Sequence, residues 1–120
     1  MVNAVAWLMF ALGIGHIGYG LIVFRRPLAE AVMAGYIGQF RTPELRATAF
    51  WFLIFGPLLM LAGQAGIHAV AVGDLALLRL VGIYLFVTAL AGVAAMPKSP
   101  FWAALISSPV LIAAGYGLLQ

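Results

Sequence analysis

The residue with the clearest capacity for chemistry is His16, which lies in a glycine-rich run at residues 13–20. An imidazole can release or take up a proton near neutral pH, so His16 is a candidate general acid or base and a candidate ligand contact. The alternative is structural, because a neutral imidazole can donate one hydrogen bond to a neighbouring helix and fix the packing. The sequence leaves both roles open.

A set of aromatic and hydroxyl residues accompanies His16 if the apolar segments of the chain form helices. Counted at 1.5 Å per residue, His16 would lie about 12 Å inside its helix, and residues of the other segments fall at similar depths. The predicted ligand-binding residues are His16, Tyr19, Thr48, Trp51, Phe55, Tyr84, Thr88, Ser107 and Ser108. Apolar walls with a few hydroxyls are typical of a pocket for a lipophilic molecule. Alternatively, the Ser and Thr hydroxyls bond to carbonyls of their own helices.

The charged residues have simpler predicted roles. Glu44 is a second candidate acid or base, although an ion pair with the nearby arginines is the alternative. Asp74 and Arg79 are expected to form a structural ion pair, with an anion-binding role for Arg79 as the alternative. The chain has three acidic residues, no cysteine and two histidines at different depths, so the sequence predicts no metal site and no cofactor.

Known catalytic motifs do not decide whether the protein is an enzyme. The phosphate-binding loop, the Gly-x-Ser-x-Gly motif and the His-Glu-x-x-His motif are all absent from the sequence. Any catalysis would depend on acid–base chemistry or on positioning of the substrate. The question of enzymatic activity is therefore open at this point.

The composition shows what kind of elements must position these residues. Hydrophobic residues make up 66% of the chain, charged residues make up 8%, and the mean hydropathy is +1.16. Soluble proteins carry roughly a quarter of charged residues, so a water-soluble monomer is excluded and an integral membrane protein is predicted. The net charge is +3, and four arginines lie between residues 25 and 46. This clustering indicates a membrane-topology signal rather than a nucleic-acid surface.

The apolar segments predict an all-α fold. At about 20 apolar residues per crossing, residues 1–120 form one domain with four transmembrane helices in a bundle. The spans are expected at about 2–24, 45–71, 75–95 and 101–119, and Gly73-Asp74 should end the second and cap the third. A short interfacial amphipathic helix is expected within residues 28–40, between the first two spans, because apolar residues recur there every four positions.

The positive charges also predict an orientation. The first connection holds four arginines and the third holds Lys98, whereas the second has only Arg79 nearby. Lysine and arginine concentrate in cytoplasmic connections of membrane proteins. The first and third connections are therefore predicted to be cytoplasmic, with both chain termini on the opposite side.

Three motifs carry a resemblance to a known family: Gly15-His16-x-x-Tyr19-Gly20, Arg46-x-x-Ala49-Phe50-Trp51-Phe52 and Met96-Pro97-x-Ser99-x-Phe101-Trp102. With these motifs, most of the chain resembles a family of small bacterial four-helix membrane proteins that is catalogued as a domain of unknown function. The resemblance implies the fold and a bacterial cytoplasmic membrane, but no activity. In size and span count the chain is also similar to small multidrug resistance transporters. It departs from them because it has His16 where they have an acidic residue, and because its first connection is longer.

Three hypotheses for the function follow. The first is a membrane protein that binds a lipid or a lipophilic small molecule within the helix bundle, or that serves as an accessory subunit, as a single chain or a homodimer. Its partners would be membrane lipids and not nucleic acids. The second is a membrane-embedded isomerase or cyclase that acts on a lipophilic substrate by acid–base chemistry. The third is a small oligomeric proton-coupled transporter.

Overall fold

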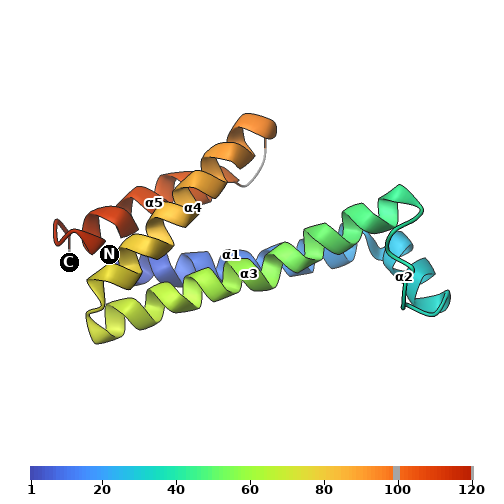
Figure 1. Cartoon of the computed structure of the whole chain (residues 1–120), viewed down its shortest axis with the longest axis horizontal. Helices are drawn as coiled ribbons and strands as arrows, with labels where there is room; N and C mark the ends of the chain where they lie inside the picture. Colours follow the sequence, from blue (N-terminus) through green and yellow to red (C-terminus); the bar gives the residue numbers. More distant parts are fainter. Residues whose placement is uncertain (99–100, 120) are drawn as a thin grey trace. The chain divides into compact units, whose positions relative to one another are not determined.

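The computed structural model of the chain describes residues 1–98 and 101–119, and all regular structure within them is helical (Figure 1). The helices in this described part are α1 (Val2–Val23), α2 (Arg25–Met33), α3 (Glu44–Val72), α4 (Leu75–Ala95) and α5 (Phe101–Gly115). The prediction of an all-α fold is therefore confirmed. Ser99 of the third sequence motif lies outside the described residues.

Three of the described helices, α1, α3 and α4, are long and apolar enough to cross a membrane. Helix α3 has 29 residues and is about 44 Å long at 1.5 Å per residue, which exceeds the roughly 30 Å hydrocarbon core of a bilayer. Helix α5 is apolar but has only 15 residues, so it is about 22 Å long. The structure thus gives three full-length candidates where the sequence predicts four spans.

Helices α2 and α5 end earlier than the segments predicted for them, which extend to residues 40 and 119. In α2, Tyr36 N–H donates to the carbonyl of Ala31, and Gly35 has a φ of 112°. In α5, Leu118 N–H donates to the carbonyl of Ala113, and Gly117 has a φ of 77°. A residue with positive φ followed by this backward hydrogen bond is the Schellman arrangement that terminates helices, and it favours glycine. Each helix therefore stops at its glycine.

The end of α3 and the start of α4 follow the sequence signals. The side chain of Asp74 accepts a hydrogen bond from the backbone N–H of Leu77 at 3.0 Å. This contact satisfies one of the unpaired N–H groups in the first turn of α4. The predicted cap at Asp74 is confirmed.

The chain divides into two compact units. One consists of residues 11–60, which are the second half of α1, all of α2 and the first half of α3. The other consists of residues 1–10 together with 61–120 and includes α4 and α5.

In the 11–60 unit, α1 and α3 run antiparallel and in close contact (Figure 1). A Cβ atom on Gly13 would lie 2.7 Å from the amide nitrogen of Met60, and one on Gly20 would lie 2.7 Å from Cδ1 of Phe52. Both distances are shorter than a carbon atom tolerates, so only glycine permits this approach. Small residues are common where helices pack in apolar surroundings for the same reason.

In the other unit, α4 packs along α5, and the start of α1 packs on the end of α3. A Cβ atom on Gly82 would lie 2.9 Å from the amide nitrogen of Ile112, and Gly63 lies directly against the backbone of Phe10. The buried apolar side chains along α4 and α5 include Leu78, Leu85, Ala89, Ala104 and Leu111. Helix packing in this unit combines close approaches at glycines with buried leucine and alanine side chains.

Candidate functional site

His16 faces α3 in the 11–60 unit. Its Nε2 atom lies 2.7 Å from the backbone carbonyl oxygen of Phe52. A carbonyl can only accept, so Nε2 carries the proton and donates this hydrogen bond. The imidazole ring also stacks on the Phe52 ring, with centroids 3.9 Å apart and an interplanar angle of 16°. His16 therefore makes the interhelical hydrogen bond that its structural role requires.

Phe52 is the centre of an aromatic cluster around His16. The Phe55 ring meets the imidazole edge-on at a centroid distance of 5.4 Å. The rings of Tyr19 and Phe24, both from the α1 side, lie 6.0 and 5.3 Å from Phe52. Tyr19 is 62% exposed, so the cluster reaches the surface of the unit. The structure thus brings together His16, Tyr19 and Phe55 of the predicted set, and Phe52 joins them.

The hydrogen bond from His16 falls at a turn of α3 that contains a proline. Pro57 lies inside α3 and has no N–H, so it cannot donate to the carbonyl of Leu53 four residues before it. The carbonyl that His16 binds belongs to the neighbouring residue, Phe52. Interior prolines in apolar helices are tolerated where neighbouring side chains supply donors to the opened turn. His16 does not fill this role, because it donates to the Phe52 carbonyl and not to the Leu53 carbonyl that Pro57 leaves without its helical donor.

The other predicted residues of this unit lie at its surface. The hydroxyl of Thr48 donates to the carbonyl of Glu44, at 3.3 Å, which is a bond within its own helix. Trp51 is 69% exposed and meets the ring of Phe50 edge-on at 5.3 Å. Glu44 is the first residue of α3 and is exposed. None of these contacts connects Thr48, Trp51 or Glu44 to His16.

Tyr84, Thr88, Ser107 and Ser108 belong to the other unit. Tyr84 is 71% exposed, whereas Ser108 is fully buried. The Ser108 hydroxyl donates a long, 3.4 Å hydrogen bond to the carbonyl of Leu105. Pro109 lies four residues after Leu105 and has no N–H for that carbonyl, so Ser108 replaces the missing helical donor. A pocket shared by this set and His16 stays a prediction.

Asp74 and Arg79 each have a different partner from the one predicted. Asp74 caps α4, as described above. The guanidinium of Arg79 donates to the carbonyl of Gly115, the last residue of α5, at 2.7 Å, and lies 5.1 Å from the centre of the Tyr116 ring. A cation at this position satisfies an unpaired carbonyl and complements the negative end of the α5 dipole.

We expect Arg79→Met to loosen the end of α5. The change removes the charged hydrogen bond to Gly115 and the contact with Tyr116, and should lower the free energy of unfolding by about 1–2 kcal/mol. Hydrogen–deuterium exchange of the backbone should become faster in residues 112–118. Lys98→Met, which removes an exposed cation, serves as the control and should leave this exchange unchanged. Equal exchange in Arg79→Met and wild type would show that the contact contributes no stability.

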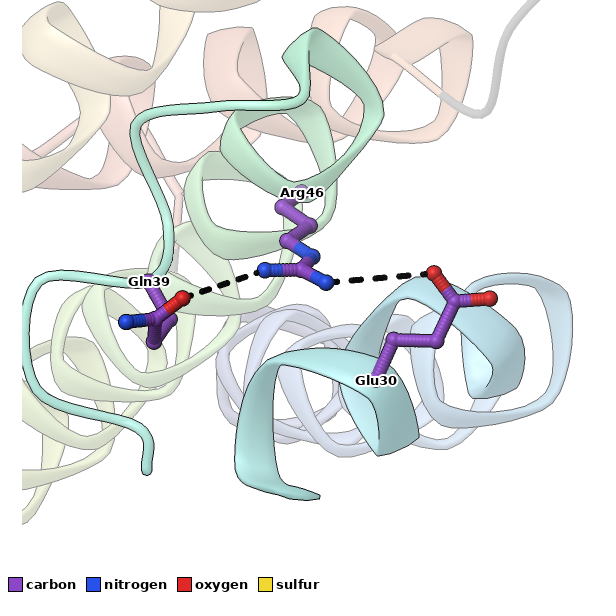
Figure 2. A network of polar contacts seen from close by, with 3 residues as sticks. All are labelled: Glu30, Gln39 and Arg46. Carbon is purple, nitrogen blue, oxygen red and sulfur yellow. Dashed lines mark hydrogen bonds and ion pairs between the residues drawn. The ribbon is translucent and has the colours of Figure 1, made fainter. Parts of the chain in front are cut away.

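A polar network joins α2, the following loop and α3 within the 11–60 unit (Figure 2). The guanidinium of Arg46 donates to Oε1 of Gln39 at 3.3 Å, and it lies 4.0 Å from a carboxylate oxygen of Glu30. Arg46 thus pairs with Glu30 of α2. The loop between α2 and α3 is held to α3 through these side chains.

Phe52 and Gln39 are among the residues of these sites that the sequence does not single out. Phe52 provides both the acceptor and the stacking surface for His16, and Gln39 provides the acceptor for Arg46. Phe52 directly follows the predicted Trp51 in the sequence. The rotation of α3 about its axis decides which of the two contacts His16. Within the described residues, no three His, Asp or Glu side chains are placed to hold a metal ion.

Comparison with known protein families gives a match over nearly the whole chain. The model of a family of unknown function (DUF6463) matches residues 2–116, which is nearly the whole chain. The chain belongs to this family. Membership in DUF6463 confirms the resemblance to an uncharacterised family and assigns no activity to His16 or to the Arg46 network. No curated protein and no solved structure matches the chain.

Proposed function

We propose that this DUF6463 protein is a small integral membrane protein that binds a lipid or lipophilic small molecule against the aromatic cluster around His16. Apolar surface that the chain itself does not cover supports the membrane location. In the most apolar stretches of α1, α3 and α4, only 22%, 11% and 22% of the residues are buried. On α4, the exposed side chains of Leu80, Tyr84 and Val87 recur at helical spacing. Lipid chains would solvate such a surface.

The proposed topology follows the charge distribution. Helices α1, α3 and α4 cross the bilayer, α5 completes a fourth, shorter span, and α2 lies along the membrane surface. The arginine-rich connection faces the cytoplasm, and both termini face the opposite side. A bacterial cytoplasmic membrane is the proposed location.

The observation that carries the binding proposal is the open surface beside the aromatic cluster. Gly15 lies one helical turn before Tyr19, on the same face of α1. Apart from the adjacent backbone of α1 itself, no atom lies within 4 Å of where a Cβ on Gly15 would be, and the same holds for Gly18. Together with the exposed Tyr19, these glycines leave an apolar and aromatic surface free for a flat or chain-like lipophilic molecule.

Native mass spectrometry in mild detergent, followed by extraction and identification of bound lipids and metabolites, tests the proposal. Gly15→Leu adds bulk to the open surface at a position where a Cβ has no neighbour within 4 Å, so it should release a specific co-purifying molecule. Ala4→Leu adds the same bulk at another exposed position of α1 and should retain that molecule. The intact mass also distinguishes a single chain from a homodimer.

Two outcomes would contradict the binding proposal. One is a protein with no specific co-purifying molecule, and the other is a molecule that both variants retain equally. Either result would favour the role of an accessory subunit whose exposed helices contact a partner membrane protein.

A further inference from the structure

The guanidinium of Arg46 has hydrogen-bond donors that its neighbours do not fully use. Its side chain is only 16% exposed, and its Nε atom is buried without a hydrogen-bond partner. The neutral amide of Gln39 accepts one hydrogen bond at 3.3 Å, and Glu30 stands at the 4.0 Å limit of an ion pair. The Glu30 side chain is itself 61% exposed, so water screens its charge. Arg46 therefore has donor capacity and charge that these two residues leave unused.

The surroundings add positive charge. Arg26 precedes Glu30 by one turn of α2, so the two residues share a face of the helix, and Glu30 pairs with Arg46. Arg41 follows Gln39 by two residues and is exposed. Residues 25–46 contain four arginines and two glutamates. This surplus of positive charge attracts anions to this end of the unit.

We infer that this end of the 11–60 unit binds the phosphate group of an anionic phospholipid headgroup. Arg46 and Arg26 donate to the phosphate oxygens, Arg41 adds charge, and Glu30 is an internal anion that competes with the lipid. Arginine suits this role because its planar guanidinium donates two parallel hydrogen bonds to a phosphate. The inference rests on the membrane location proposed above, since α1 and α3 would place the network at headgroup level.

Variants of Arg26 and Glu30 should change lipid binding in opposite directions, and this difference tests the proposal. Purified full-length protein in mild detergent is titrated with phosphatidylglycerol or with phosphatidylcholine, and binding is measured by native mass spectrometry. Phosphatidylglycerol should bind more tightly.

Arg26→Gln should weaken the binding of phosphatidylglycerol about fivefold, as expected for one basic residue at a membrane surface. Glu30→Gln should strengthen binding several-fold, because it removes the competing anion. Arg46→Gln should have the largest effect.

The control is Lys98→Gln, which removes an exposed positive charge outside this network and should leave phosphatidylglycerol binding unchanged. Arg26 and Glu30 are exposed, so their variants give the answer even where Arg46→Gln fails to fold. Equal binding of the two lipids, or the same binding constants in wild type, Arg26→Gln and Glu30→Gln, would overturn the proposal.

Two further measurements distinguish a lipid headgroup site from a free-phosphate site and from a failure of membrane insertion. Displacement of phosphatidylglycerol by millimolar inorganic phosphate would overturn the assignment to a lipid, because the site would then take free phosphate. Stable incorporation of every variant into phosphatidylcholine nanodiscs tests the membrane location separately. Failure of headgroup selectivity with normal incorporation would refute only the headgroup site, whereas failure of incorporation would refute the proposed function.

Discussion

His16→Ala should lower the free energy of unfolding of the protein in detergent by about 2 kcal/mol. The substitution removes the 2.7 Å hydrogen bond to the Phe52 carbonyl and the stacking of the imidazole on the Phe52 ring. Unfolding by increasing sodium dodecyl sulfate in mixed micelles, followed by circular dichroism, measures the change.

His16→Phe separates the two contributions of the side chain. A phenyl ring can stack on Phe52 but cannot donate to its carbonyl, so the loss should fall to about 1 kcal/mol, the value of one interhelical hydrogen bond. Wild-type stability in both variants would mean that the contact does not hold α1 to α3. A lost ligand together with wild-type stability would instead assign His16 to binding alone.

The second large effect is expected at Gly13 in α1. Gly13→Ala would place a Cβ 2.7 Å from the Met60 amide nitrogen and 2.9 Å from the Gly56 carbonyl oxygen. Both are backbone atoms and cannot rotate away, so α1 and α3 must separate. We expect a loss of about 3 kcal/mol, at the upper end of the range for overpacked cores.

Gly15→Ala, two residues further along α1, should have the opposite sign. Open space surrounds its position, and alanine stabilises a helix interior by up to about 1 kcal/mol relative to glycine. The same titration with sodium dodecyl sulfate measures both variants. Equal stability of Gly13→Ala and Gly15→Ala would contradict the close approach of α1 and α3 at Gly13.

The sequence predicts the helical class because it follows from composition and from local signals. Apolar runs of this length specify helices, and Gly73-Asp74 specifies a helix end and a cap from adjacent residues. The ends of α2 and α5 are harder to predict. Gly35 and Gly117 terminate helices, whereas Gly13 and Gly20 allow α1 to pack on α3. These roles depend on φ and on contacts that glycine content does not reveal.

The sequence identifies the central residue of the site, His16, but not the residues that contact it. His16 stands out because an ionisable group is rare in an apolar helix. Its partner Phe52 is 36 positions away in the sequence, so finding it requires the register and rotation of α3 against α1. A rotation of about 100°, one residue of a helix, separates Phe52 from the predicted Trp51. Likewise, the charges in the sequence do not show whether Glu30 or Glu44 pairs with Arg46.

The pairing of Ser108 with Pro109 has a consequence for how the family can vary. Pro109 leaves the Leu105 carbonyl without its helical donor, and the fully buried Ser108 supplies a replacement. If proline were retained and serine lost, the carbonyl would be unpaired. If serine were retained and proline lost, the hydroxyl would compete with a backbone N–H for the same acceptor. We therefore expect the two neighbouring positions to change together among members of the family.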